Sequence, residues 1–434
     1  MDKFVIRGGN PLVGTIRVSG AKNSALPCMA AAILTEETVT LENIPQVRDI
    51  ATERKLLSSM GAEVELGSGA NDHRTTICCR TLSDPVAKYE IVKTMRASSL
   101  VLGPLIARTG MARVAMPGGC AIGGRPIDLH IAGLEKMGAT IVQEHGYLEA
   151  RADRLRGAHL VFDKITVTGT EDLLMAAVVA DGETLMENCA REPEVTDLAE
   201  LLIAMGAKID GAGTSAIRVQ GVSSLRGASY RINPDRIEAG TFLIAGAITA
   251  GDLTVADCNP SHLGAVIARL KEAGARVDIL SPDAVRVRAE ANLKATDIST
   301  EEYPGFPTDM QAQYMALTTQ AEGVSTIKEN IFENRFMHVQ ELVRMGANIR
   351  VDGRTATVRG PAKLSAAAVM CSDLRASASL VLAALVADGE SILDRVYHMD
   401  RGYERFEEKL QQVGAEIQRM GNVFPSKSGE AAAD

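Results

Sequence analysis

The sequence predicts an α/β fold built from six repeated units, grouped as two halves of three units each. Three observations predict it: a Gly-Ala step that recurs six times, a helical pattern before each step, and an alternating strand pattern after it. Self-similarity of this kind indicates duplicated supersecondary units. Six units of about 70 residues exceed one ordinary hydrophobic core, which favours two globular halves. Stacking of the units into a solenoid is the alternative architecture.

The Gly-Ala step lies where a helix is predicted to end. Leu198, Leu201, Leu202 and Met205, for example, have the i, i+3, i+4, i+7 spacing of one helix face. Glycine then ends the helix in the left-handed position, and a strand follows. The six glycines are 68 to 77 residues apart and are Gly61, Gly138, Gly206, Gly274, Gly346 and Gly414.

Each unit also begins with an apolar, Ala-rich helix, followed in most units by a turn that contains glycine and then by a short strand such as "TLMENC". A unit is therefore predicted to run helix, strand, loop, helix, strand, with more strand before the next unit. The first strand, within "DKFVIRGG", lies outside the first unit. We expect it to pair with the last half.

The composition is that of an ordinary globular protein, with 434 residues, of which 46% are hydrophobic and 23% charged. No apolar run approaches the length of a membrane span, and the first residues do not resemble a signal peptide. The net charge of −9 argues against a general nucleic-acid binder, although a local cation cluster could still bind a small anion.

The chain also lacks the motifs of common cofactor sites. Seven cysteines without a CxxC pair, and histidines without ligand spacing, indicate neither a disulfide framework nor a metal site. No GxxxxGK[ST] or GxGxxG nucleotide motif is present. We therefore expect no cofactor, no metal and a cytoplasmic location.

Charged residues recur at equivalent positions of the repeat. The starts of the Ala-rich helices, 37 to 42 residues before each step, carry Lys22, Arg96, Thr168, Arg236, Asp309 and Arg375. A second set, 11 to 15 residues before the step, is Arg48, Arg125, Arg191, Arg335 and Arg401. Cations at helix starts oppose the helix dipole, so an anionic ligand between these ends would explain them. The alternative for any single loop arginine is a solvated side chain. Together they predict a cleft that binds a phosphate or carboxylate.

One loop, "PGGCAIGGRP" at 117–126, places Cys120 between two pairs of glycines. Four glycines in seven residues pack poorly and are typical of a lid or active-site loop. Cys120, with Arg125 nearby, could act as an acid or a nucleophile. An incidental loop cysteine is the alternative.

Several long motifs resemble the UDP-N-acetylglucosamine 1-carboxyvinyltransferase family of enolpyruvyl transferases. They are "SGAKNSALP", "KTMRAS", "PGGCAIGGRPIDLH", "AREPE", "FPTDMQAQ", "FENRFMH", "DLRASASLV" and "DRGYER". The resemblance covers residues 1–421 and implies an inside-out α/β barrel, with six repeated units as two domains of three. It implies one domain of residues 22–233, which carries the Cys120 lid, and a second of 1–21 plus 234–421. Residues 422–434 lie outside it and are expected to be disordered.

The family reaction transfers the enolpyruvyl group of phosphoenolpyruvate to the 3′-hydroxyl of UDP-N-acetylglucosamine, a committed step of bacterial peptidoglycan synthesis. It proceeds through a tetrahedral ketal and releases phosphate. The resemblance implies Cys120 as general acid and Asp309 as base, with Lys22 and Arg401 also catalytic. It implies alkylation of Cys120 by fosfomycin.

The same resemblance implies two sets of binding residues. The phosphoenolpyruvate set is Lys22, Asn23, Arg125, Arg375 and Arg401, with Asp373 beside Arg375. The nucleotide-sugar set is Asn23, Arg96, Arg125, Pro126, Ile127, Asp128, Leu129, Lys164, Ile165, Thr166, Val167, Asp309 and Ile331. Other members carry glycine where this chain has Thr168.

Three alternatives stay open at this point. The sister enzyme that acts on shikimate 3-phosphate shares the fold, but the "GGC" and "RPIDLH" segments favour the nucleotide sugar. An enzyme that cyclises RNA 3′-phosphates would need a nucleophilic histidine and ATP. A non-catalytic sensor of anionic metabolites would need neither an acid such as Cys120 nor a base such as Asp309.

Overall fold

The computed structural model describes residues 2–67, 72–116 and 127–421. Within these ranges the strands form six four-stranded sheets, as expected for six repeated units. Three sheets make up what we call the first lobe: β14 (Ser229–Arg231), β3 (Val39–Glu42), β5 (Thr75–Cys78) and β4 (Glu63–Leu66); β6 (Val86–Ala87), β7 (Met111–Ala115), β9 (Tyr147–Arg151) and β8 (Thr140–Glu144); β10 (His159–Val161), β11 (Glu183–Glu187), β13 (Ala216–Gln220) and β12 (Lys208–Asp210).

The other three sheets make up the second lobe. They are β2 (Val13–Arg17), β15 (Asp252–Ala256), β17 (Ala284–Arg288) and β16 (Arg276–Ser281); β18 (Ile298–Ser299), β19 (Gly323–Lys328), β21 (Thr355–Gly360) and β20 (Asn348–Asp352); β22 (Ala368–Met370), β23 (Glu390–Asp394), β1 (Lys3–Arg7) and β24 (Glu416–Met420).

All six sheets have the same internal order. A strand that follows one unit pairs in parallel with the first strand of the next unit. That first strand pairs antiparallel with a third strand, which in turn pairs antiparallel with the fourth. In the first lobe β14, which follows the third unit, returns to pair with β3 of the first unit. In the second lobe β2 takes the corresponding place beside β15, and β1 lies between β23 and β24. The expected pairing of the first strand with the last half is thus confirmed.

Each lobe has three central helices. They are α1 (Lys22–Ala31), α4 (Leu102–Thr109) and α6 (Val167–Ala177) in the first lobe, and α8 (Arg236–Ile248), α10 (Gln311–Thr318) and α12 (Leu374–Ala384) in the second. Most residues of these helices are buried, and α4 departs from this only in its last three residues, which are half-buried or exposed. A helix that is apolar on all sides must be covered on all sides, and these helices are rich in alanine and other small residues that allow close packing.

The second helix of each unit is amphipathic or shorter. These helices are α2 (Arg48–Ser59), α5 (Asp128–Lys136), α7 (Pro193–Ala204), α9 (Gly264–Glu272), α11 (Val339–Arg344) and α13 (Phe406–Gln411). The six predicted glycines follow these helices with φ between +97° and +107°. Only glycine adopts that conformation readily, so the predicted helix ends are confirmed. The remaining helical segments are α3 (Tyr89–Val92), η1 (Ala32–Leu34), η2 (Arg96–Val101), η3 (Pro260–Leu263), η4 (Thr308–Met310) and η5 (Val396–Arg401).

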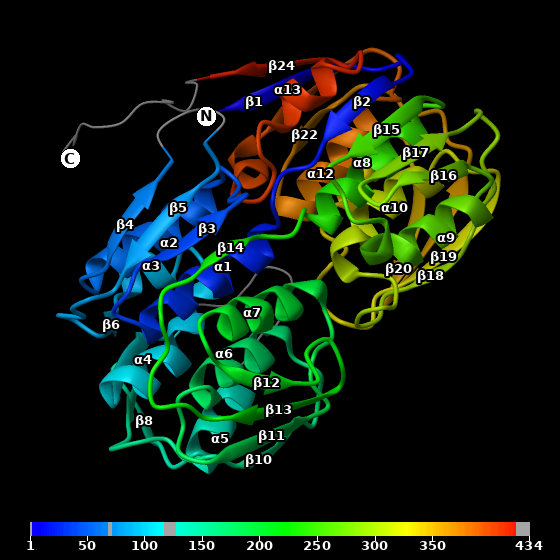
Figure 1. Cartoon of the computed structure of the whole chain (residues 1–434). Coiled ribbons are helices and arrows are strands. Elements are labelled where there is room, and N and C mark those ends of the chain that lie inside the picture. The colour runs from blue at the N-terminus through cyan, green and yellow to red at the C-terminus, as the bar shows by residue number, and fades with distance from the viewer. Residues whose placement is uncertain (1, 68–71, 117–126, 422–434) are drawn as a thin grey trace.

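The architecture is an inside-out α/β fold, in which sheets lie at the outside of each lobe and helices fill the inside (Figure 1). The sheets remain separate, and none of those described closes into a barrel. Two hydrophobic clusters form the cores, one in each lobe. The domain limits 22–233 and 1–21 plus 234–421 stay a prediction, which these two clusters support. None of the described helices combines the length and apolarity needed to cross a membrane.

Candidate active site

The candidate site lies where the chain passes between the two lobes. Gly20 and Pro234 form an antiparallel bridge, and Ala21 N donates to Asn233 O at 2.8 Å. The first helix of each lobe begins directly after this bridge, α1 at Lys22 and α8 at Arg236. The two predicted helix-start cations are therefore brought to the same crossing.

A first group of three charges joins the lobes. Asp49, in the first turn of α2, accepts from Lys22 Nζ at 3.0 Å and from Arg401 Nε at 3.0 Å. Burial raises the pKa of the Asp49 carboxyl, but the charges of Lys22 and Arg401 lower it by more. Lys22 and Arg401 are thus brought together, as the sequence predicts, by an aspartate that the sequence analysis did not single out.

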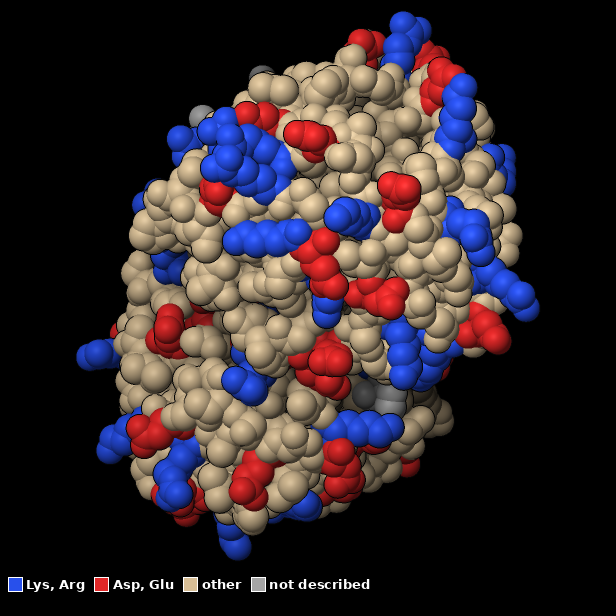
Figure 2. Space-filling model, turned by 90° about the vertical axis from the view of Figure 1, so that its right-hand side faces the viewer, with Lys and Arg blue, Asp and Glu red and all other residues tan. Residues whose placement is uncertain are grey.

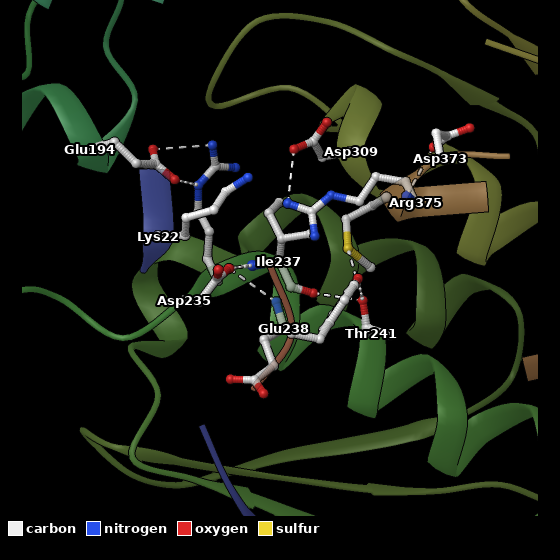
Figure 3. Close-up of polar contacts among 12 residues, drawn as sticks. Lys22, Glu194, Asp235, Ile237, Glu238, Thr241, Asp309, Asp373 and Arg375 are labelled. Atoms are coloured by element: carbon white, nitrogen blue, oxygen red, sulfur yellow. Dashed lines mark hydrogen bonds and ion pairs between the residues drawn. The ribbon is translucent and has the colours of Figure 1, made fainter. Parts of the chain in front are cut away.

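A second group of three charges lies in the second lobe. Asp309, in η4, accepts from Arg335 Nη2 at 2.7 Å and from Arg375 Nη2 at 3.0 Å. Figure 3 shows Asp309 facing Arg375, which projects from the start of α12. Burial raises the pKa of Asp309, but the two guanidinium groups lower it far more. As it stands in the structure, Asp309 is a weak base.

Asp373 holds the start of α12 in place. As the N-cap residue, its Oδ1 accepts from the backbone N–H groups of Arg375 and Ala376, each at 3.0 Å. Arg375 is buried, its Nη1 has no hydrogen-bond partner, and its guanidinium lies 5.3 Å from the centre of the Tyr403 ring. An anion that reached Nη1 would satisfy a buried donor.

Arg236, at the start of α8, also has a carboxylate partner. Its Nε and Nη2 donate to Glu194 of α7 at 3.0 and 3.2 Å. The argument from the helix dipole needed an anionic ligand to explain the cations at the helix starts, whereas Asp49, Asp309 and Glu194 already balance three of them. A ligand must therefore compete with these carboxylates or add to their network.

Basic and acidic side chains are interspersed over most of the face shown in Figure 2. The cations at the helix starts are instead largely buried, with Lys22 and Arg375 exposing 11% and 4% of their side chains. The site is thus formed by internal ion pairs.

Glu53 lies one turn after Asp49 on α2 and is 1% exposed, and neither of its carboxyl oxygens has a hydrogen-bond partner. Burial, with a further contribution from the charge of Asp49, raises its pKa from 4.5 to about 8. At neutral pH the folded protein therefore holds a proton here that the unfolded chain has released.

The proton on Glu53 leads to a prediction about how the free energy of unfolding depends on pH. Between the unfolded and folded pKa values the native state binds more protons, so its stability falls as pH rises through that window. In Glu53→Gln we expect this loss to disappear, so that the decrease in unfolding free energy between about pH 5 and pH 8 is smaller than in wild type by about 3 kcal/mol. Urea unfolding at the two pH values measures it, and equal decreases in both proteins would contradict it.

The described residues of the expected nucleotide-sugar set lie mainly on segments that start helices of the first lobe. Ile127 is the buried N-cap of α5, and Asp128 and Leu129 open that helix. Lys164 and Ile165 lead to Thr166, whose Oγ1 caps α6 by accepting from Gly169 N at 3.1 Å, and Val167 is its first residue.

Three further residues of that set lie elsewhere. Asn23 is exposed beside Lys22, and Arg96 opens η2. Ile331 belongs to the second lobe and donates its backbone N–H to Glu329 Oε1 at 2.9 Å.

Glu329 is a residue that the sequence analysis missed. Its carboxylate is 1% exposed and accepts from Thr300, Thr308, Ile331 and Phe332 at 2.9 to 3.1 Å. It therefore ties η4, which carries Asp309, to the loop that carries Ile331. Glu329 directly follows β19, and no pattern in the sequence at that position identifies this role.

Cys120, Arg125 and Pro126 lie outside the described residues, as do residues 422–434, so their expected roles stay predictions. The six described cysteines are free. Among the described residues, no group of three or more His, Cys, Asp or Glu side chains could hold a metal ion.

Known proteins show which class of enzyme this chain belongs to, the carboxyvinyltransferases. The sequence model described as EPSP synthase (3-phosphoshikimate 1-carboxyvinyltransferase) matches residues 6–410, and the chain belongs to this family. It is 79% identical over 427 residues to the UDP-N-acetylglucosamine 1-carboxyvinyltransferase of Acidobacterium capsulatum, with 98% of each chain covered. It is 71% identical over 432 residues to the protein of that name from Koribacter versatilis, with 100% of each covered.

Solved structures share the fold of this chain. The enolpyruvyl transferase NikO from Streptomyces tendae superposes with a TM-score of 0.86 at 26% identity, covering 96% of this chain and 98% of that one. EPSP synthase from Acinetobacter baumannii gives a TM-score of 0.72 at 19% identity, covering 97% and 100%, which shows the shared fold.

Proposed function

We propose that this protein transfers the enolpyruvyl group of phosphoenolpyruvate to the 3′-hydroxyl of UDP-N-acetylglucosamine and releases phosphate. The observation that carries the proposal is the full-length identity of 79% and 71% to two proteins named for that transfer. The same names support a role in peptidoglycan synthesis.

The described cations suit the anionic substrate. Phosphoenolpyruvate carries a phosphate and a carboxylate, both of which arginine can bind through two parallel hydrogen bonds. Lys22 and Arg401 share one carboxylate, Asp49, and Arg335 and Arg375 share another, Asp309. Each group therefore keeps one net positive charge for a substrate anion.

In this proposal Asp309 accepts the proton of the sugar hydroxyl. Its two ion pairs make it a weak base in the structure described here. If the substrate anion draws Arg375 toward itself, one of the two charges that lower the pKa of Asp309 moves away. Substrate binding would then make Asp309 more basic at the point where the reaction needs a base.

Protonation of the methylene carbon of phosphoenolpyruvate needs an acid, in addition to the base that takes the proton of the sugar hydroxyl. We assign that role to Cys120 on the strength of the sequence resemblance. The hydroxyl oxygen attacks the neighbouring carbon as the proton is added, which gives a ketal with a methyl group and leaves the acid as a thiolate. The ketal then loses phosphate while one methyl proton returns to the thiolate, and this restores the double bond. We propose no metal or cofactor for this scheme.

The test is phosphate release from phosphoenolpyruvate, with UDP-N-acetylglucosamine or shikimate 3-phosphate as the acceptor. We expect release with the nucleotide sugar only, and a decrease of at least about 100-fold in Cys120→Ala. Cys78→Ala is the matched control, because Cys78 is a half-buried free thiol at the end of β5.

The outcomes separate the claims. Release with shikimate 3-phosphate instead would transfer the assignment to the sister activity. Full activity of Cys120→Ala with the nucleotide sugar would keep the reaction and remove Cys120 as the acid. Release with neither acceptor would overturn the proposed function.

A further inference from the structure

A buried chain of hydrogen bonds in the first lobe lies outside both ion-pair groups. His130 Nδ1 lies 3.3 Å from Asp172 Oδ2, and His130 Nε2 lies 3.2 Å from Thr168 Oγ1. Asp172 Oδ1 also accepts from Gly103 N at 2.7 Å. His130 and Asp172 are 1% and 0% exposed, whereas Thr168 is only half-buried. The chain thus leads from two buried side chains to a half-buried threonine.

The repeat architecture makes this arrangement possible. Thr168 and Asp172 are four residues apart on α6, so they share one face of that helix. His130 comes from the first turn of α5 and spans the gap between them. Its ring therefore joins the start of α5 to the start of α6.

These two helix starts are the segments expected to hold the nucleotide sugar. Ile127, Asp128 and Leu129 precede His130 directly, and Thr166 and Val167 precede Thr168 directly. The backbone N–H groups at the start of α6 also favour an anion. A hydroxyl fixed at this position can donate to a phosphate oxygen.

The direction of the hydrogen bonds matters for this role. Thr168 has one O–H proton, which it donates to His130 if Nε2 is unprotonated. If both ring nitrogens are protonated, His130 donates to Asp172 and to Thr168, and the O–H proton of Thr168 is free for another acceptor. In that arrangement Asp172 Oδ2, 3.3 Å from Nδ1, would lie beside the doubly protonated ring.

We infer that Thr168 is a specificity residue whose hydroxyl donates to the diphosphate of the nucleotide sugar, with His130 and Asp172 as positioning residues behind it. This inference rests on the proposed function and adds to it a side-chain contact that members with glycine at this position do not have.

The experiment compares variants of the full chain by calorimetric binding of UDP-N-acetylglucosamine and by steady-state kinetics. Thr168→Val removes the hydroxyl at nearly constant shape. We expect it to raise Kd and KM for UDP-N-acetylglucosamine about 10-fold, with kcat and the KM for phosphoenolpyruvate nearly unchanged. Thr168→Ser keeps the hydroxyl and should stay close to wild type. Thr140→Val, on the exposed edge strand β8, is the matched control.

His130→Gln tests the positioning role. We expect it to weaken nucleotide-sugar binding to a similar degree, and we expect the double variant with Thr168→Val to be no weaker than either single variant. Additive losses of binding free energy would mean that the two residues act independently and would contradict the positioning role of His130.

Two further outcomes decide the inference. Wild-type affinity in Thr168→Val, or equal losses in kcat and both KM values together with a lower Tm, would overturn it and leave the proposed function intact. Failure of the wild type itself to bind UDP-N-acetylglucosamine would overturn the proposed function and this inference with it.

Discussion

An Asp309→Asn variant is expected to lose turnover by a factor of about 1,000 while keeping its affinity for the nucleotide sugar within a few-fold. The amide has nearly the shape of the carboxylate and can still accept a hydrogen bond from Arg335 or Arg375, but it cannot take a proton from the sugar hydroxyl. Steady-state phosphate release gives kcat, and calorimetric titration with UDP-N-acetylglucosamine gives the affinity.

The same variant is also expected to change how the free energy of unfolding depends on pH at acidic pH. The pKa of Asp309 is lowered in the folded protein, so its ion pairs stabilise the native state above the ordinary carboxyl pKa and cease to do so as pH falls through the lower folded value. Asp309→Asn should therefore lose less stability than wild type on acidification below about pH 4. Asp352→Asn, on the exposed strand β20, is the control for a surface aspartate. Retained turnover in Asp309→Asn would remove Asp309 as the base.

The repeat could be predicted from the sequence because its signals are local. A glycine after an amphipathic helix and an alternating segment after the glycine are each set by neighbouring residues, and Gly61 and Gly206 adopt the expected positive φ. The return of β14 to β3 is a pairing between distant segments, and so is the place of β1 between β23 and β24, of which the sequence predicted only that the first strand pairs with the last half. Periodicity carries no information on which distant strand is the partner.

The site was predicted in part for a similar reason. Lys22, Arg236 and Arg375 could be found because equivalent positions of a repeat carry cations against the helix dipole. Asp49 could not, because an acidic residue in the first turn of α2 is already explained by that dipole. Its role depends on Arg401, which lies in the other lobe and 352 residues away in the sequence. The sequence also could not show that Asp309 is held as a weak base by Arg335 and Arg375.

Asp49→Asn is expected to have the largest effect on stability, lowering the free energy of unfolding by about 3 to 5 kcal/mol. Asp49 is buried and is the carboxylate that both Lys22 and Arg401 contact, so its neutralisation leaves the buried Lys22 ammonium without a counter-charge. The loss acts between the lobes, since Lys22 and Asp49 belong to the first and Arg401 to the second. Urea unfolding of the whole chain, followed by circular dichroism, measures it.

Asp84→Asn is the control that separates a buried pair from a surface pair. Asp84 lies 3.3 Å from Lys88 in the same lobe, but both side chains are exposed, so we expect a change below about 1 kcal/mol. Both substitutions replace an aspartate that pairs with a lysine by asparagine, one in a buried pair and the other in an exposed pair. The catalytic consequence follows from position: without Asp49, Lys22 and Arg401 are no longer held side by side, and we expect the KM for phosphoenolpyruvate to rise at least about 10-fold. If Asp49→Asn unfolded at the same urea concentration as wild type, Asp49 would not hold the two lobes together through Lys22 and Arg401, and any change in KM would have to come from charge alone.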